Sequence, residues 1–266
     1  MLIHLVLEKW GEDLCQAMPQ DGGFEPSEVR GIVKHVARGV AHLHTVLGCV
    51  HGDLKPANIL VKRMPSSREG ASGLVCKVCD LGCALQGDPA LRILVNREEI
   101  SQNGLPVMTL NVRAPEVLFG DARFSYPIDA WSLGVVTALV AGYAFTTLAR
   151  NEVDYRLALF KQLGVPCEEA ELTKLPLWPQ SPPRMQAKPW PDAVVSRLGE
   201  LGLCCLQSLL TWAPSRRLKV AEVTAQGWFA DTEASRRAFG AEGTSSQPAP
   251  ASTATAASAG FLPFQR

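Results

Sequence analysis

Residues 51–60 read HGDLKPANIL, and the triplet DLG follows at residues 80–82. In chain order these segments supply a carboxylate, an ammonium group and two hard oxygen ligands: Asp53, Lys55, Asn58 and Asp80. A carboxylate can accept a proton, and carboxylate and amide oxygens suit Mg²⁺. One base, one cation and a pair of metal ligands are what transfer of a phosphoryl group requires. The pattern therefore predicts phosphate chemistry.

The stretch resembles the eukaryotic protein kinase family, whose catalytic loop reads H-R-D-L-K-P-x-N and whose metal motif reads D-F-G. Further segments are similar to other motifs of that family. RAPE at residues 113–116 resembles A-P-E, and DAWSLG at residues 129–134 resembles D-x-W-S-x-G. PSRRL at residues 214–218 is similar to the P-x-x-R near the domain's end, and LVLE at residues 5–8 to the strand before the hinge. The resemblance covers about residues 3–230.

Within the family, residues 109–120 and 159–166 look most like the cyclin-dependent kinase group. That group usually carries Trp-Tyr where this chain has Asn111-Val112, so proline-directed substrate choice does not carry over. An alternative resemblance is to the small-molecule phosphotransferases that are similar to aminoglycoside kinases, because their catalytic loop often reads H-G-D-L-x-x-x-N. They generally lack Lys55 and the motifs at residues 113–116 and 129–134, which favours the protein kinase resemblance.

The resemblance implies a serine/threonine kinase that uses ATP and Mg²⁺ on a protein substrate. Asp53 would accept the proton of the substrate hydroxyl, and Lys55 would steady the migrating phosphoryl group. Asn58 and Asp80 would hold Mg²⁺. Lys55 also marks the serine/threonine branch.

The same resemblance implies a nucleotide site near the N-terminal end of the chain. Glu8 and Trp10 would offer hinge backbone groups to adenine, and Leu60 would be its apolar floor. Asp13 is placed to reach the ribose, and Leu7 would occupy the gatekeeper position. The alternative for all five is a plain strand end and core.

Other positions are expected to be structural. Glu116 and Arg217 should form a buried ion pair between the activation segment and the lower helices. Asp129 would hold the backbone of the catalytic loop. His51 and Leu81 would pack in the core spine rather than do chemistry.

The chain begins at the segment that resembles the hinge strand. No glycine-rich loop, phosphate-pairing lysine or orienting glutamate precedes it, so we expect a kinase C-lobe with its N-lobe missing. Such a truncated chain should have low or no activity. The alternative is a non-catalytic, pseudokinase-like interaction module. A cyclin-type partner is not expected, because its usual docking helix belongs to the missing lobe.

Two substitutions bear on regulation. Gly52 replaces the arginine that pairs with a phosphate in kinases switched by loop phosphorylation. Gly104 stands where cyclin-dependent kinases carry their activating threonine. Both indicate activity that does not need phosphorylation of the activation segment, and an essential phosphosite at Ser101 would contradict this. Thr109 is expected to orient the catalytic loop.

The fold class is predicted as mainly α, an α+β kinase-like C-lobe in which helices surround a buried central helix, with short β-hairpins at the catalytic loop. We expect strands at residues 3–7, 59–62 and 75–79. A long amphipathic helix should begin with Ser27 as N-cap and end near Gly48.

The domain boundaries follow from the same pattern. The kinase domain is predicted over residues 1–232, and an Ala/Ser/Thr/Pro-rich tail over residues 240–266 is expected to be disordered. Within the domain, residues 80–116 should form a long irregular loop, and residues 175–191 a proline-rich interruption between helices.

Composition excludes several classes. The chain has 266 residues, with 26 Lys+Arg against 26 Asp+Glu, so charge gives no argument for a nucleic-acid or membrane-surface partner. With 47% hydrophobic residues it is neither globally disordered nor fibrous. Residues 130–149 carry no charge, which fits a bilayer span, but their Ser, Thr and Gly content and the lack of basic flanks favour a buried helix.

The eight cysteines follow no recognisable secretory signal, so a reduced intracellular compartment, cytoplasmic or nuclear, is expected. Cys76 and Cys79 have the spacing of a metal or redox pair. They lie in a predicted strand, where residues three apart point to opposite faces, so we interpret them as structural. His42 and His44 diverge by roughly 200° on a helix and make a poor chelate.

Overall fold

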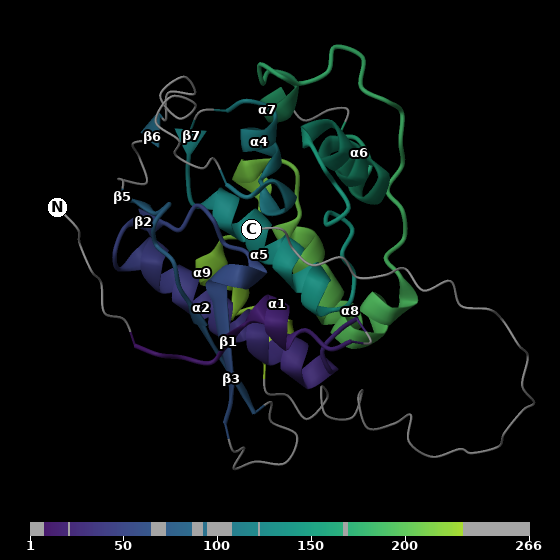
Figure 1. Cartoon of the computed structure of the whole chain (residues 1–266). Helices are drawn as coiled ribbons and strands as arrows, with labels where there is room; N and C mark the ends of the chain where they lie inside the picture. The colour runs from purple at the N-terminus through teal and green to yellow at the C-terminus, as the bar shows by residue number, and fades with distance from the viewer. Residues whose placement is uncertain are drawn as a thin grey trace, which may run out of the picture.

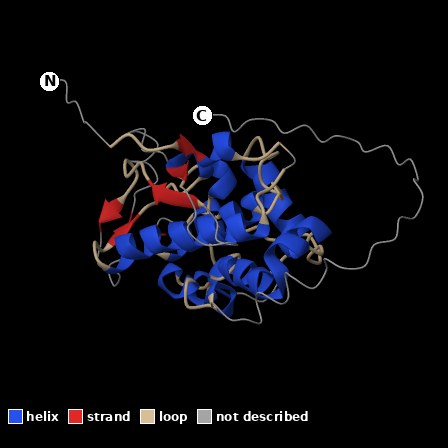
Figure 2. Ribbon diagram, turned by 90° about the horizontal axis from the view of Figure 1, so that it is seen from below, coloured by secondary structure: helices blue, strands red, loops and turns tan. Residues whose placement is uncertain are grey.

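The computed structural model describes residues 8–20, 22–64, 73–86, 93–94, 108–121, 123–166 and 170–230. They form a mixed α+β fold that is mostly helical, with short antiparallel strands gathered at one side of the helical body (Figures 1 and 2). The helices are α1 (Leu14–Ala17), α2 (Pro26–Thr45), α4 (Pro115–Leu118), α5 (Pro127–Val140), α6 (Glu152–Leu163), α7 (Ala170–Thr173), α8 (Asp192–Leu209) and α9 (Val220–Val223). The strands are β1 (Glu12–Asp13), β2 (Cys49–Val50), β3 (Ile59–Arg63), β4 (Leu74–Val78), β5 (Leu85–Gln86), β6 (Ile93–Leu94) and β7 (Arg123–Phe124). Single 3₁₀ turns are η1 (Pro56–Asn58), η2 (Leu110–Val112), η3 (Pro214–Arg216) and η4 (Gly227–Phe229).

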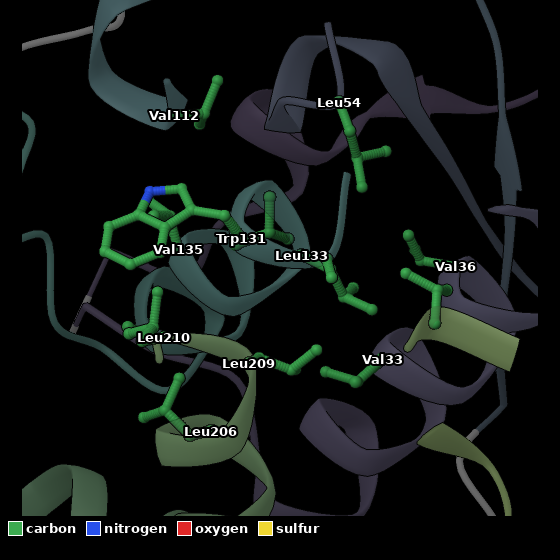
Figure 3. Close-up of a cluster of buried hydrophobic side chains, with 14 of the residues drawn as sticks. Val33, Val36, Leu54, Val112, Trp131, Leu133, Val135, Leu206, Leu209 and Leu210 are labelled. Atoms are coloured by element: carbon green, nitrogen blue, oxygen red, sulfur yellow. The ribbon is translucent and has the colours of Figure 1, made fainter. Parts of the chain in front are cut away.

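Helix α5 is the centre of the core. Each of its residues from Ile128 to Val140 is buried, as the uncharged sequence predicts. Gly134 lets the end of α8 approach closely, since a Cβ there would lie 2.8 Å from Cδ2 of Leu210. Figure 3 shows Leu133 of α5, Leu209 of α8 and Val33 of α2 in one buried cluster.

The uncharged run is not helical throughout. Helix α5 stops at Val140, and the chain then turns through Gly142, whose φ is +91°. A φ of this sign favours glycine, because a Cβ would be strained. Among the described residues, no helix is long and apolar enough to cross a membrane.

Helix α2 packs its apolar face against α5, α8 and β4, as its sequence spacing predicts. The prediction of Ser27 as N-cap is wrong. Glu25 is the N-cap, and it forms a capping box with Glu28, in which each side chain bonds the other's backbone. Pro26 then occupies the first helical position, where its missing N–H is not needed.

The main sheet has the order β1-β3-β4, and both neighbours pair antiparallel. The predicted strands at residues 59–62 and 75–79 are confirmed, with ends shifted by one residue. Asp13, Leu60 and Lys77 are partners across the three strands and therefore share one face. Val61 and Cys76 lie on the opposite, buried face.

The prediction of an irregular segment at residues 80–116 is wrong in part. Strand β5 pairs with β2, β6 pairs with β7, and η2 and α4 follow. Strands of two residues carry no periodicity that a sequence pattern could reveal.

The proline-rich segment at residues 175–191 is free of helix and strand, as predicted. The strand expected at residues 3–7, the tail beyond residue 240, Ser101 and Gly104 lie outside the described residues.

The two cysteines with the spacing of a metal or redox pair lie at and next to β4. Cys76 is buried and Cys79 is half-buried, and both are free thiols. Burial raises the pKa of Cys76 to about 12, so the thiol stays protonated at neutral pH. Within the described ranges, no three His, Cys, Asp or Glu side chains gather as metal ligands.

Candidate functional site

The site forms along the loop of residues 51–58, between β2 and β3. Its centre is the buried carboxylate of Asp53. Oδ1 of Asp53 accepts hydrogen bonds from the backbone N–H of Thr109, at 2.9 Å, and from its hydroxyl, at 2.7 Å. Oδ2 accepts from Nζ of Lys55 at 2.7 Å. The carboxylate therefore has a fixed orientation and a cation beside it.

Lys55 links the two sides of this site. Its ammonium group also donates to the Thr109 hydroxyl, at 3.0 Å. Asp53, Lys55 and Thr109 thus form a closed ring of hydrogen bonds between segments more than fifty residues apart. These contacts give Thr109 the geometry for the role that its sequence position predicts, orientation of the catalytic loop.

Asn58 and Asp80 come together through the backbone. The N–H of Cys79 donates to the carbonyl of Asn58 at 2.9 Å, which places Asp80 beside the end of η1. Nδ2 of Asn58 donates to the carbonyl of Asp53 at 2.9 Å, so its amide oxygen remains an acceptor. Asp80 is exposed and has φ of +61°, and its Oδ1 accepts from the N–H of Gly82.

The chemistry of these two side chains fits a magnesium ion. An amide oxygen and a carboxylate are hard ligands, and Mg²⁺ in nucleotide sites takes one or two protein groups and completes its shell with phosphates and water. Asn58 and Asp80 offer one such oxygen group each, on segments that a backbone hydrogen bond joins. Both residues could therefore act as ligands of the ion.

Asp129, in the first turn of α5, binds the backbone of the loop through its carboxylate. Its Oδ1 accepts from the N–H of Gly52 at 3.0 Å, and its Oδ2 from the N–H of His51 at 2.8 Å. Both contacts agree with the role expected of Asp129. Oδ2 also lies 2.7 Å from Nε2 of His44, a contact that the sequence does not predict, because no local pattern connects residues 85 positions apart.

His51 is fully buried and bridges two segments of the site. Its Nδ1 accepts from the N–H of Asp53 at 3.2 Å, and its Nε2 donates to the carbonyl of Cys79 at 3.1 Å. Leu81 does not pack in a spine with it: the prediction is wrong, since this residue is 53% exposed. Asp80, the residue before Leu81, has a left-handed backbone with φ of +61°.

Gly52 has a backbone conformation that favours glycine. Its φ is +79°, and a Cβ would lie 2.8 Å from the carbonyl oxygen of Cys83. Strand pairing between β2 and β5 brings the two segments this close.

Burial raises the pKa of the Cys83 thiol, and the charges of Asp53 and Asp80 add to that effect. Cys83 is therefore a poor nucleophile despite its place in the site.

Glu116 and Arg217 form the expected buried pair. Nη1 and Nη2 of Arg217 donate to the two carboxylate oxygens of Glu116 at 2.8 and 2.9 Å. The remaining guanidinium protons reach the carbonyls of Thr211, Trp212 and Pro127. Every donor of this buried cation is thus satisfied, which is the condition for a stable buried ion pair.

The residues expected at a nucleotide lie at the sheet. Asp13 and Leu60 are cross-strand partners, and Asp13 also caps α1 by accepting from the N–H of Gln16 at 3.0 Å. Nζ of Lys77 lies 3.7 Å from the ring centroid of Trp10 and 2.7 Å from Oε2 of Glu8. Leu7 lies outside the described residues.

Comparison with models of known protein families matches residues 2–229 to the protein kinase domain. The match spans most of the chain, and it includes every site residue from Glu8 to Arg217. The chain belongs to the protein kinase family.

Proposed function

We propose that this member of the protein kinase family transfers the γ-phosphoryl group of ATP to a serine or threonine hydroxyl of a protein, and that it does so at a low rate. The observation that carries the proposal is the Asp53 carboxylate, which Thr109 and Lys55 orient at 2.7–2.9 Å. A positioned carboxylate can accept the hydroxyl proton as the nucleophile attacks. The serine/threonine assignment rests on the family resemblance, in which a lysine two residues after the catalytic aspartate, here Lys55, marks that branch; its Nζ lies 2.7 Å from Oδ2 of Asp53.

The magnesium ligands in this proposal are the amide oxygen of Asn58 and the carboxylate of Asp80. Mg²⁺ would neutralise phosphate charge when it is bound with the nucleotide. The hydrogen bond from the Cys79 N–H to the Asn58 carbonyl keeps the two ligands on adjoining segments. Asp80 is exposed, so its carboxylate is accessible to an ion from solvent.

For the nucleotide, we assign the face of the β1-β3-β4 sheet that carries Asp13 and Leu60. Leu60 would contact adenine, Asp13 the ribose, and the backbone near Glu8 and Trp10 the adenine edge. The cross-strand pairing of Asp13 with Leu60 supports this assignment. Leu7 is proposed as gatekeeper on the family resemblance alone.

We further propose that the kinase domain extends to about residue 232 and that the described residues form the helical lower lobe of a kinase. The buried central helix and the scarcity of long strands in the described ranges support the lobe assignment. The resemblance of residues 109–120 to cyclin-dependent kinases supports that subgroup.

The test is transfer of labelled γ-phosphate from Mg-ATP to a generic protein substrate by the purified chain. Asp53→Asn should lower the rate by about 10²–10⁴-fold, because it removes the proton acceptor. Asp80→Ala should abolish the Mg²⁺-dependent rise in melting temperature with ATP, because it removes a metal ligand. Glu200→Gln, an exposed change on α8, is the control and should leave both readouts unchanged.

Equal transfer by wild type and Asp53→Asn would contradict the proposal. An inactive wild type that shows no nucleotide-dependent thermal shift would also contradict it, and would support the non-catalytic interaction module instead.

A further inference from the structure

The connection between α7 and α8 carries prolines in a regular pattern. Residues 179–184 read PQSPPR, with Pro179 and Pro182 three positions apart and Arg184 two positions further on. A proline fixes its own φ and disfavours the helical conformation at the residue before it. Such a stretch favours the polyproline II conformation, which has about three residues per turn. The structure shows neither helix nor strand over these residues.

The exposure of the side chains repeats with the same period. Pro179, Pro182 and Met185 are half-buried, and the pairs of residues between them, 180–181 and 183–184, are exposed. A repeat of three fits a polyproline helix that lies with one edge along the protein and two edges in solvent. The rings of Pro179 and Pro182 keep part of their surface accessible.

The segment is fixed to the protein at both ends. The Trp178 ring packs against Phe119, with centroids 4.6 Å apart, and the N–H of Leu177 donates to the carbonyl of Phe119 at 2.9 Å. After the motif, the carbonyl of Met185 accepts from the N–H of Val165 at 3.1 Å. Between these contacts the chain runs along the outer edge of the molecule (Figure 1). A binding partner therefore meets a segment that is already ordered, which lowers the entropic cost of binding.

The charge of the segment is positive. Between Glu171 and Asp192 the sequence contains Lys174, Arg184 and Lys188 and no acidic residue. All three cationic side chains are exposed. Within the part of the chain that the structure describes, Arg184 has no ion pair, so its guanidinium is available to a carboxylate of a partner.

We propose that residues 179–184 are a docking site for an SH3-type domain, which binds P-x-x-P segments in a groove lined by aromatic side chains. Pro179 and Pro182 would fill the apolar pockets of the groove, and Arg184 would pair with a carboxylate at its end. The proposal is independent of the proposed function, because it uses no group of the phosphoryl-transfer site. The competing explanation is that the prolines only stiffen the connection between α7 and α8.

The first experiment compares the folded chain with a free peptide. A panel of purified SH3 and WW domains is titrated with a synthetic peptide of residues 176–187, and the SH3 domains that bind it are then titrated with the full chain. We expect the chain to bind within about tenfold of the peptide or more tightly, since its segment is already ordered. Weaker binding than this would overturn the proposal, because the half-buried prolines would then be inaccessible. A peptide that binds no SH3 domain, or binds only WW domains, would also overturn it.

The second experiment uses two variants of the full chain, each with a matched control. Arg184→Ala should weaken binding by about 10–100-fold, because hydrogen bonds to a charged partner are lost. Lys174→Ala removes an exposed charge outside the motif and should bind like the wild type. Pro182→Ala should weaken binding by about tenfold, because it removes the ring and the fixed φ. Pro189→Ala removes an exposed proline outside the motif and should have no effect.

Equal binding by a variant and its control would contradict the proposal. The same changes in the peptide, which needs no folded protein, provide a second measurement if a variant chain does not fold. Full-strength binding by the Arg184→Ala or Pro182→Ala peptide would contradict the assigned roles of these side chains.

Discussion

Two ion pairs of this molecule have the same length and different surroundings. The guanidinium of Arg217 contacts Glu116 at 2.8 Å, and that of Arg63 contacts Glu28 at 2.8 Å. The first pair has side chains 0% and 4% exposed, the second 71% and 15%. Arg217 also donates to three backbone carbonyls, whereas the exposed pair competes with water. Equal distance therefore does not mean equal contribution to stability.

The largest effect is expected at the buried pair. Arg217→Met should lower the free energy of unfolding by about 3–5 kcal/mol, because it leaves the Glu116 carboxylate buried and unpaired. Urea denaturation measures this change. Lys219→Met is the control, since this neighbouring lysine is 78% exposed and its contact with Glu222 is long, at 3.6 Å. A loss as small as that of the control would show that the core tolerates the orphaned carboxylate.

A second variant tests whether burial or attraction dominates at this pair. The double change Glu116→Leu and Arg217→Met removes both charges and leaves neither partner buried without the other. It should recover part of the stability that Arg217→Met loses. A double variant less stable than the single one would show that the pair itself, and not the orphaned charge, accounts for the loss.

An intermediate effect is expected at Gly52, where the constraint is backbone geometry rather than charge. Gly52→Ala should lower the free energy of unfolding by about 1–2 kcal/mol from the left-handed φ alone. The close approach of the Cys83 carbonyl adds to that loss. Thermal or urea denaturation checks this, with Gly227→Ala as the control, since a Cβ there meets only ordinary contacts at 3.7 Å. An unchanged midpoint for Gly52→Ala would mean that the loop can relax.

The smallest effect is expected at the exposed pair. Arg63→Met should change the free energy of unfolding by about 0–1 kcal/mol, because solvent screens the charges of Arg63 and Glu28. Any loss should shrink further in about 1 M salt, where the Debye length is about 3 Å. A loss of stability as large as that of Arg217→Met would show that burial does not distinguish the two ion pairs.

The parts of the fold that could be predicted are those with a local signal. Helix α5 is visible as an uncharged run, α2 as a three-and-four spacing, and β3 and β4 as short apolar runs. The Glu25 cap could not be predicted from preference, since Ser27 is the better N-cap residue, while the capping box with Glu28 decides the outcome. Strand β5 gives no signal in the sequence, because two residues are too few to show the alternation of apolar and polar side chains that marks a strand.

The candidate site could be predicted only where a motif carries it. Asp53, Lys55, Asn58 and Asp80 stand in recognisable segments, and hydrogen bonds connect these segments around one loop. The contact of His44 with Asp129 depends on how α2 crosses α5, which is a property of the packed helices. The exposure of Leu81 could not be predicted either, because a motif gives the residue type and not what packs against its side chain.

The ladder between β3 and β4 ends with a hydrogen bond from the N–H of Met64 to the carbonyl of Gly73, at 2.7 Å. The register that aligns Asn58 with Cys79 is therefore complete before the chain leaves the sheet. The pairs from Ile59 with Val78 to Arg63 with Leu74 are formed within the two strands, so the register is specified by residues 59–63 and 74–78 themselves. A fluorescent reporter inserted between Met64 and Gly73 is accordingly expected to leave the proposed magnesium ligands in place.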